Sequence, residues 1–141
     1  MGYNIQIKHS TAVIPTENKD EVLQIWKDLN KPENNHRKRG GRWRKGEQIA
    51  WWYSWMPSDY DITANSVEDV LKELGFETEI DHDGNVLICE YDSKKGQEEM
   101  FFNEVSQLIK GHIMWEGEDG STWVWKLGKK FALDYSDYSD I

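Results

Sequence analysis

Residues 76–91 read FETEIDHDGNVLICEY, and this stretch decides the fold. Two runs that favour β structure, 76–80 and 86–91, flank the dipeptide Asp83-Gly84. Asp-Gly between two such runs is a strong signal for a β-hairpin, because both residues accept the positive φ angles of a tight turn. The stretch therefore predicts two adjacent antiparallel strands.

A helix is expected directly before this hairpin. Asn65 or Ser66 can cap its first turn, and Gly75 can end it in the left-handed conformation. Between these ends the apolar residues recur at helical spacing and form one stripe, Val67, Val70, Leu71 and Leu74. The pattern predicts an amphipathic helix that packs through this stripe.

The same order of elements occurs again nearer the C-terminus. A helix near 97–110 ends at Gly111, and a second hairpin forms around the turn glycine Gly120. These two glycines have the same spacing as Gly75 and Gly84. Two helix–hairpin units are therefore expected in the C-terminal half; the other residues diverge, so a duplication is one explanation of the spacing and coincidence is the other.

Shorter patterns predict the remaining elements. We expect a helix over 17–30 and extended segments or strands over 3–8, 12–15, 49–56, 112–116, 122–127 and 131–133. In the strand 49–56, the side chains of Trp51, Tyr53 and Trp55 share one face. Residues 31–48 contain one apolar side chain, Trp43, and predict a long exposed loop.

The fold class that follows is α+β, a mainly antiparallel sheet with three helices. We expect a single domain over residues 1–134 and an acidic, flexible tail over 135–141. The side chains expected in the buried core are those of Ile5, Ile7, Trp26, Leu71, Leu74, Ile88, Val105 and Ile109.

The composition favours a folded cytoplasmic protein. Of the 141 residues, eight are Trp, and aromatic side chains at this density argue against a disordered chain. No apolar run approaches the roughly 18 residues that cross a bilayer, and the N-terminus lacks a signal-peptide pattern. A single cysteine, Cys89, cannot form an internal disulfide, so we expect a reducing compartment and a buried structural role for this thiol.

Charge is distributed very unevenly along the chain. Residues 1–56 carry 10 Lys and Arg against 6 Asp and Glu, a net charge of +4, whereas residues 57–141 carry 7 against 20, a net charge of −13. All four arginines fall within residues 37–44. Clustered arginines can bind phosphates or carboxylates, and a nearby Trp can stack on a partner. The candidate partner-binding residues are Arg37, Lys38, Arg39, Arg42, Trp43, Arg44, Lys45 and Trp52.

The other candidate sites are weaker. The carboxylates of Glu116, Glu118 and Asp119 form an acidic rim that could contact a basic protein. The four histidines follow no zinc spacing, and Asp81-His82-Asp83 is explained by a turn. We therefore expect no metal, no cofactor and no catalytic residue, although a solvated, functionless basic loop remains the alternative to a binding site.

Several short segments resemble a loose group of small, uncharacterised bacteriophage and prophage accessory proteins. The resemblance rests on the opening GYNI at 2–5, on WYSWM at 52–56, and on GHIMWEGEDG at 111–120 with Trp123, Trp125 and the Gly128-Lys129 turn after it. It implies a protein that binds a host protein, often one of antiviral defence, without enzyme chemistry. The arginine cluster lies outside the shared segments.

These observations together give two expectations about function. The first is a non-enzymatic, anti-CRISPR-like protein of the bacterial host cytosol that inhibits or modulates a host protein, with a nucleic-acid-handling defence enzyme as the leading target. Its acidic surface would face the basic groove of that enzyme while the arginine cluster anchors elsewhere. The alternative is a nucleotide or nucleic-acid binding module that uses residues 37–45.

Overall fold

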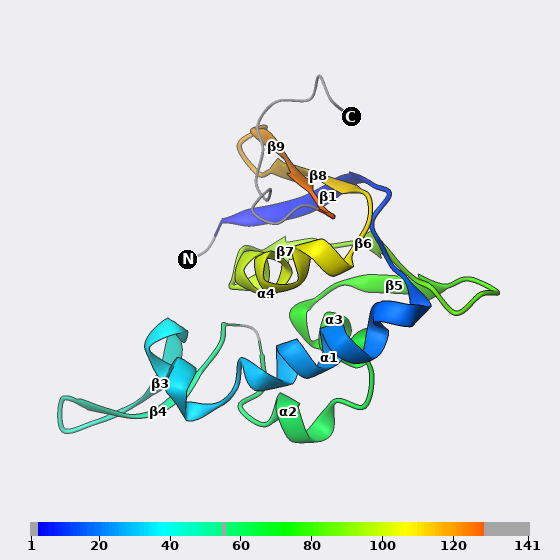
Figure 1. Ribbon diagram of the computed structural model, residues 1–141. Helices are drawn as coiled ribbons and strands as arrows, with labels where there is room; N and C mark the ends of the chain where they lie inside the picture. The colour runs from blue at the N-terminus through cyan, green and yellow to red at the C-terminus, as the bar shows by residue number, and fades with distance from the viewer. Residues whose placement is uncertain (1–2, 55, 129–141) are drawn as a thin grey trace.

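The computed structural model describes residues 3–54 and 56–128, which form an α+β fold (Figure 1). Over these residues there are nine strands, four α-helices and three 3-10 helices. In chain order they are β1 (Asn4–Ser10), β2 (Val13–Ile14), η1 (Thr16–Asn18), α1 (Lys19–Asp28), η2 (Pro32–Arg37), β3 (Gly40–Arg44), β4 (Glu47–Trp52), α2 (Tyr60–Thr63), α3 (Val67–Leu74), β5 (Glu77–Ile80), β6 (Val86–Glu90), β7 (Asp92–Lys94), α4 (Glu98–Val105), η3 (Ser106–Leu108), β8 (His112–Gly117) and β9 (Thr122–Lys126). None of the helices in the described residues is long and apolar enough to cross a membrane.

The strands are antiparallel, as predicted, but they divide among three sheets. The largest has the order β7-β1-β8-β9, the second has the order β2-β6-β5, and β3 pairs with β4 alone. Strand β1 pairs with β8 of the second hairpin, and β2 pairs with β6 of the first. The N-terminal segment therefore links the two helix–hairpin units.

Both predicted helix–hairpin units are confirmed. The first consists of α3, β5 and β6, and the second of α4, η3, β8 and β9. The two glycines that follow the helices, Gly75 and Gly111, have φ angles of 108° and 96°, and the two turn glycines, Gly84 and Gly120, both have 86°. Left-handed backbone at these four positions accounts for the glycine spacing in the sequence.

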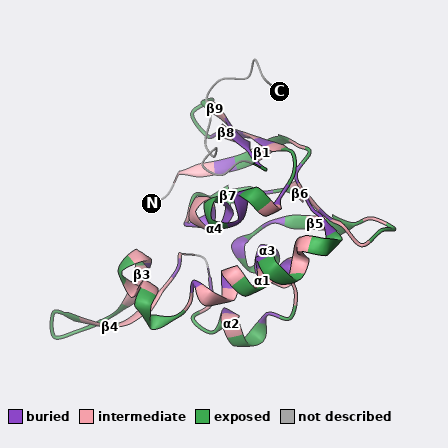
Figure 2. Cartoon of the chain, in the orientation of Figure 1, coloured by how far each residue is buried: buried purple, intermediate pink, exposed green. Residues whose placement is uncertain are grey.

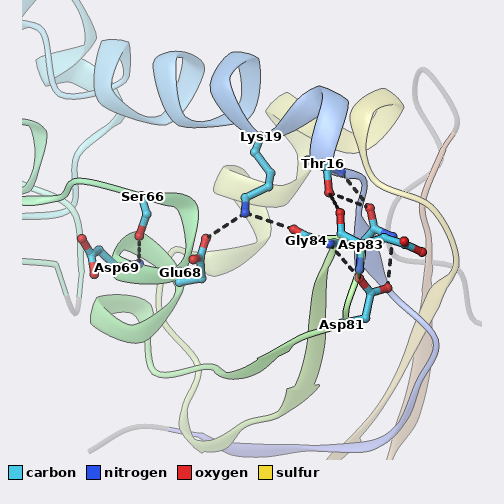
Figure 3. Close-up of polar contacts among 9 residues, drawn as sticks. Thr16, Lys19, Ser66, Glu68, Asp69, Asp81, Asp83 and Gly84 are labelled. Atoms are coloured by element: carbon cyan, nitrogen blue, oxygen red, sulfur yellow. Dashed lines mark hydrogen bonds and ion pairs between the residues drawn. The ribbon is translucent and has the colours of Figure 1, made fainter.

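Polar contacts join the first hairpin to the start of α1 (Figure 3). One carboxylate oxygen of Asp81 accepts hydrogen bonds from the backbone N–H groups of Asp83 and Asn85, each at 2.9 Å, and this fixes the turn. Thr16 Oγ1 donates to the backbone oxygen of Asp83 at 2.7 Å, and Lys19 Nζ donates to that of Gly84 at 3.1 Å. Hydrogen bonding lowers the pKa of Asp81, so its carboxylate is an element of the turn.

The core is aromatic and lies between the helices and the two larger sheets (Figure 2). Trp26 of α1 contacts Phe101 and Phe102 of α4, and its indole N–H donates to the backbone oxygen of Phe101 at 2.8 Å. On the sheet side, Phe102 packs against Trp125 of β9, whose ring meets Trp115 at a centroid distance of 4.8 Å. Helix α4 therefore joins α1 to the four-stranded sheet.

Seven of the eight predicted core residues are buried, and Ile7 is half-buried against the core. The predicted helices correspond to α1, α3 and α4, but the count of three is too low, since α2 (Tyr60–Thr63) also forms. The short strand β7 was also not predicted. Trp55, the strand expected at 131–133 and the tail 135–141 lie outside the described residues.

The expectation of a long loop over residues 31–48 is wrong. Residues 32–37 form η2, and β3 and β4 form a hairpin whose last pair is Arg44 with Glu47. The two turn residues between them, Lys45 and Gly46, have φ angles of 53° and 82°. Positive φ at both central positions is the geometry of a type I′ hairpin turn, for which glycine is favoured.

Candidate functional site

Three of the four arginines and Lys45 stand on or directly before this hairpin, which projects away from the rest of the molecule (Figure 1). We call residues 39–52 the basic arm. It carries four cations, Arg39, Arg42, Arg44 and Lys45, against the single carboxylate of Glu47. Its two strands pair only with each other among the described strands.

The four cations of the basic arm are available to a partner. All four residues are exposed, and within residues 3–54 and 56–128 their side chains make no hydrogen bond or ion pair. The indole of Trp43 lies among them and is 66% exposed, which is unusual for so large an apolar side chain. A cationic and aromatic surface of this kind is suited to binding anionic groups.

Glycines allow the arm to pack closely on itself. A Cβ atom at Gly41 would lie 2.4 Å from the backbone oxygen of Ala50, and one at Gly40 would lie 2.5 Å from the ring of Trp52. Trp52 is half-buried against this glycine and is therefore less accessible than Trp43. Gln48 Nε2 also bonds to the backbone oxygen of Ala50 at 3.1 Å, next to a register shift in the ladder.

Two other candidates, Arg37 and Lys38, hold the base of the arm. The guanidinium of Arg37 forms an ion pair with Glu104 of α4. Lys38 is only 9% exposed, and its ammonium donates to the backbone oxygen of Asn30 at 2.8 Å and to Asn35 Oδ1 at 2.9 Å. Burial lowers the pKa of this lysine. The structure therefore separates the predicted cations into two groups, two within the fold and four in solvent.

Gln97, which carries no recognisable signal in the sequence, lies directly beneath the arm. It precedes α4, is 5% exposed, and makes three hydrogen bonds through one side-chain amide. Its oxygen accepts from the backbone N–H of Arg39 at 3.1 Å and from that of Ser54 at 2.9 Å. Its nitrogen donates to the backbone oxygen of Arg37 at 2.8 Å. Both ends of the arm are thus bonded to the start of α4.

A shallow pocket of about 320 Å³ lies at the base of the arm. Arg37 and Arg39 line it from one side, and Gln97, Met100 and Asn103 line it from the side of α4. The pocket is open, and Glu99 at its edge opposes the charge of the arginines. It adds surface next to the arm rather than an enclosed small-molecule site.

The residues of the predicted acidic rim contact the N-terminal strand. Asp119 accepts a hydrogen bond from the hydroxyl of Tyr3, which lowers the pKa of the carboxyl and raises that of the phenol. The other two carboxylates also accept hydrogen bonds: Glu116 from Gln6 Nε2 at 2.9 Å and Glu118 from the backbone N–H of Asn4 at 2.8 Å. A partner at this rim would compete with contacts that hold β1 in place.

Other chemistry-bearing residues do not assemble into a centre. No group of three or more His, Cys, Asp or Glu in the described part of the chain is arranged to hold a metal ion. Comparison with protein-family models, with curated proteins and with solved structures found no match to the chain. Among the described residues, the basic arm is the feature best suited to contact a partner.

Proposed function

We propose that this chain is a non-enzymatic binding protein, of the phage accessory kind, that inhibits or modulates a protein of the bacterial host cytosol. The observation that carries the proposal is the basic arm. Its four cations make no internal side-chain bonds within the described residues, and Trp43 is exposed among them. Free arginines around an exposed aromatic ring are typical of the residues that dominate protein interfaces.

The charge distribution favours a partner that handles nucleic acid. Residues 57–141 carry a net charge of −13, so the body of the protein is acidic while the arm is basic. A nucleic-acid-handling enzyme has a basic groove that attracts the acidic body, and acidic surface beside that groove would receive the arm. Such complementarity raises the association rate and excludes partners of uniform charge.

Direct binding of a nucleotide or nucleic acid is the second candidate. A two-stranded β-ribbon fits the major groove of DNA, and β3–β4 is such a ribbon with arginines and a tryptophan on it. We rank this candidate lower because the protein has a net charge of −9, which repels the phosphates of a nucleic acid. The arm is the most concentrated group of cations in the sequence that could oppose that repulsion.

Affinity capture from a host lysate tests the first proposal. The bait is the parent protein or an arm variant that combines Arg39→Ala, Arg42→Ala, Arg44→Ala and Lys45→Ala. A matched control removes four exposed cations of the body, through Lys8→Ala, Lys72→Ala, Lys94→Ala and Lys110→Ala. It has the same net charge as the arm variant.

We expect the parent and control baits to capture one nucleic-acid-handling protein and to inhibit the activity of that protein. The arm variant should not capture it. Equal capture by the arm variant would contradict the proposal. Submicromolar binding of the parent to a DNA or RNA oligonucleotide near 0.15 M salt, lost in the arm variant, would move the second candidate ahead.

A further inference from the structure

We infer that Gln97 is the positioning residue of the basic arm, which it holds in one orientation by bonding to both of its ends. The inference rests on the proposed function for its biological meaning. Its structural part can be tested without knowing the partner.

The bonds of Gln97 reach the two ends of the arm at once. Its amide oxygen lies between the backbone N–H groups of Arg39, where the chain enters the arm, and Ser54, where the chain has left it. Its amide N–H donates to the backbone oxygen of Arg37. With 5% of its surface exposed, this amide is shielded from the water that would otherwise replace these bonds.

The other hydrogen bonds and ion pairs of side chains at the base each reach one end only, although the ammonium of Lys38 also lies over the ring of Tyr53, 5.7 Å from its centroid. Lys38 and the Arg37–Glu104 ion pair act on the incoming segment. On the outgoing segment, the hydroxyl of Tyr53 donates to the backbone oxygen of Leu29 at 2.8 Å. Among the described residues, Gln97 is the side chain whose hydrogen bonds join the two segments to each other.

The hydrogen bond between Gln97 and the backbone of Arg39 lies where it can set the orientation of the arm. Arg39 lies directly before the ladder of the arm, which begins with the pairs Gly40–Trp52 and Gly41–Trp51, so the bond that Gln97 makes lies at the junction between the arm and the rest of the fold. Loss of the bonds that Gln97 makes would let the paired strands swing together about this junction. An arm with many orientations loses more conformational entropy when it binds than an arm held in one. Gln97 therefore affects affinity without touching the partner.

Distance measurement by electron paramagnetic resonance tests the orientation. Nitroxide labels are placed at Glu47→Cys on the arm and Lys8→Cys on β1, with Cys89→Ser to remove the native thiol. In this background we compare Gln97 with Gln97→Ala. The matched control is Ser66→Ala, which removes the hydrogen bond that caps α3 and destabilises the fold away from the arm.

We expect a narrow distance distribution in the parent and in Ser66→Ala, and a clearly broader one in Gln97→Ala. If Gln97→Ala does not fold, Gln97→Glu decides the question: it keeps both acceptor bonds, loses the donor to Arg37, and should broaden the distribution to a smaller extent. A distribution as narrow as that of the parent in a folded Gln97 variant would overturn the inference.

The capture experiment tests whether the orientation of the basic arm affects binding. Gln97→Ala should recover several-fold less partner than Ser66→Ala. Unchanged recovery with a broadened distribution would show that arm orientation does not matter for binding, and would overturn that part of the inference. Failure of the parent to capture any partner would count against the proposed function and leave the distance result standing.

Discussion

Arg37 and Glu104 form an ion pair between the segment that enters the basic arm and helix α4. About a third of each side chain is exposed, at 31% and 34%, so water screens the pair only in part. This contact distinguishes Arg37 from the arginines farther along the arm, which have no such partner among the described residues.

Arg37→Ala should therefore lower stability, whereas the arm cations should not contribute to it. We expect Arg37→Ala to reduce the free energy of unfolding by about 0.5–1 kcal/mol, the usual range for a partly exposed ion pair. Urea unfolding followed by Trp fluorescence measures the change. A Glu104→Ala variant should lose a similar amount, and the double variant should lose less than the sum of the two.

The arm variant should unfold like the parent. Exposed charges that make no contact typically change stability by less than about 0.5 kcal/mol each. Removal of four cations next to each other should if anything relieve their mutual repulsion. A melting temperature several degrees below that of the four-lysine control would show that the arm cations bind the acidic body and that the arm is a structural element.

Lys38 should behave as a core residue despite its place in the basic segment. Lys38→Ala removes the donor to the backbone oxygen of Asn30 and leaves a buried space beneath the arm. We expect a loss of about 1–3 kcal/mol in the free energy of unfolding, the typical cost of an unpaired buried polar group. Hydrogen exchange should show the loss at the base of the arm and the end of α1 first.

Glu98 should make stability depend on pH. Its side chain is fully buried, one carboxylate oxygen has no hydrogen-bond partner among residues 3–54 and 56–128, and burial raises its pKa. The folded state then holds this proton more tightly than the unfolded state does. The contribution of Glu98 to the free energy of unfolding therefore falls as the pH rises from the pKa of the unfolded state, about 4.3, through the raised pKa of the folded state.

Glu98→Gln removes that dependence, because a neutral amide does not titrate in this range. The amide oxygen can still accept the backbone N–H of Gly96, which lies 2.8 Å from the carboxylate. We expect the variant to be more stable than the parent near pH 7 by about 1–3 kcal/mol, with the difference shrinking toward pH 4. A difference that stays constant between pH 4 and pH 7 would contradict the assignment.

The sequence predicts the helix–hairpin units well because their signals are local. Ser66 does cap α3, accepting from the backbone N–H of Asp69 at 3.2 Å, and the four glycines occupy left-handed positions. The strand expected over 49–56 overlaps β4, but β3 and the hairpin escaped prediction, because neither strand of the arm has a fully buried face. The short sequence of β3, GGRWR, gives no clear strand pattern, and the Lys45-Gly46 turn was the local signal for its pairing with β4.

The sequence could not predict which of the basic residues contact the rest of the fold and which are exposed to solvent. Lys38 lies between the half-buried Arg37 and the exposed Arg39, and its ammonium is held by Asn30, just after α1, and by Asn35. Gln97 lies 60 residues along the chain from Arg37 and 43 residues from Ser54, which belong to the two segments that it joins. No spacing rule in the sequence links residues so far apart, so hydrogen bonds such as those of Lys38 and Gln97 are seen only in the folded structure.

The affinity of the captured host partner for the parent and for the arm variant, measured by calorimetry near 0.15 M salt, tests the central claim most directly. Each charge-assisted contact contributes about 1.5–3 kcal/mol, so the account predicts at least tenfold weaker binding by the arm variant and unchanged binding by the four-lysine control. Equal affinity of the parent and the arm variant would contradict it.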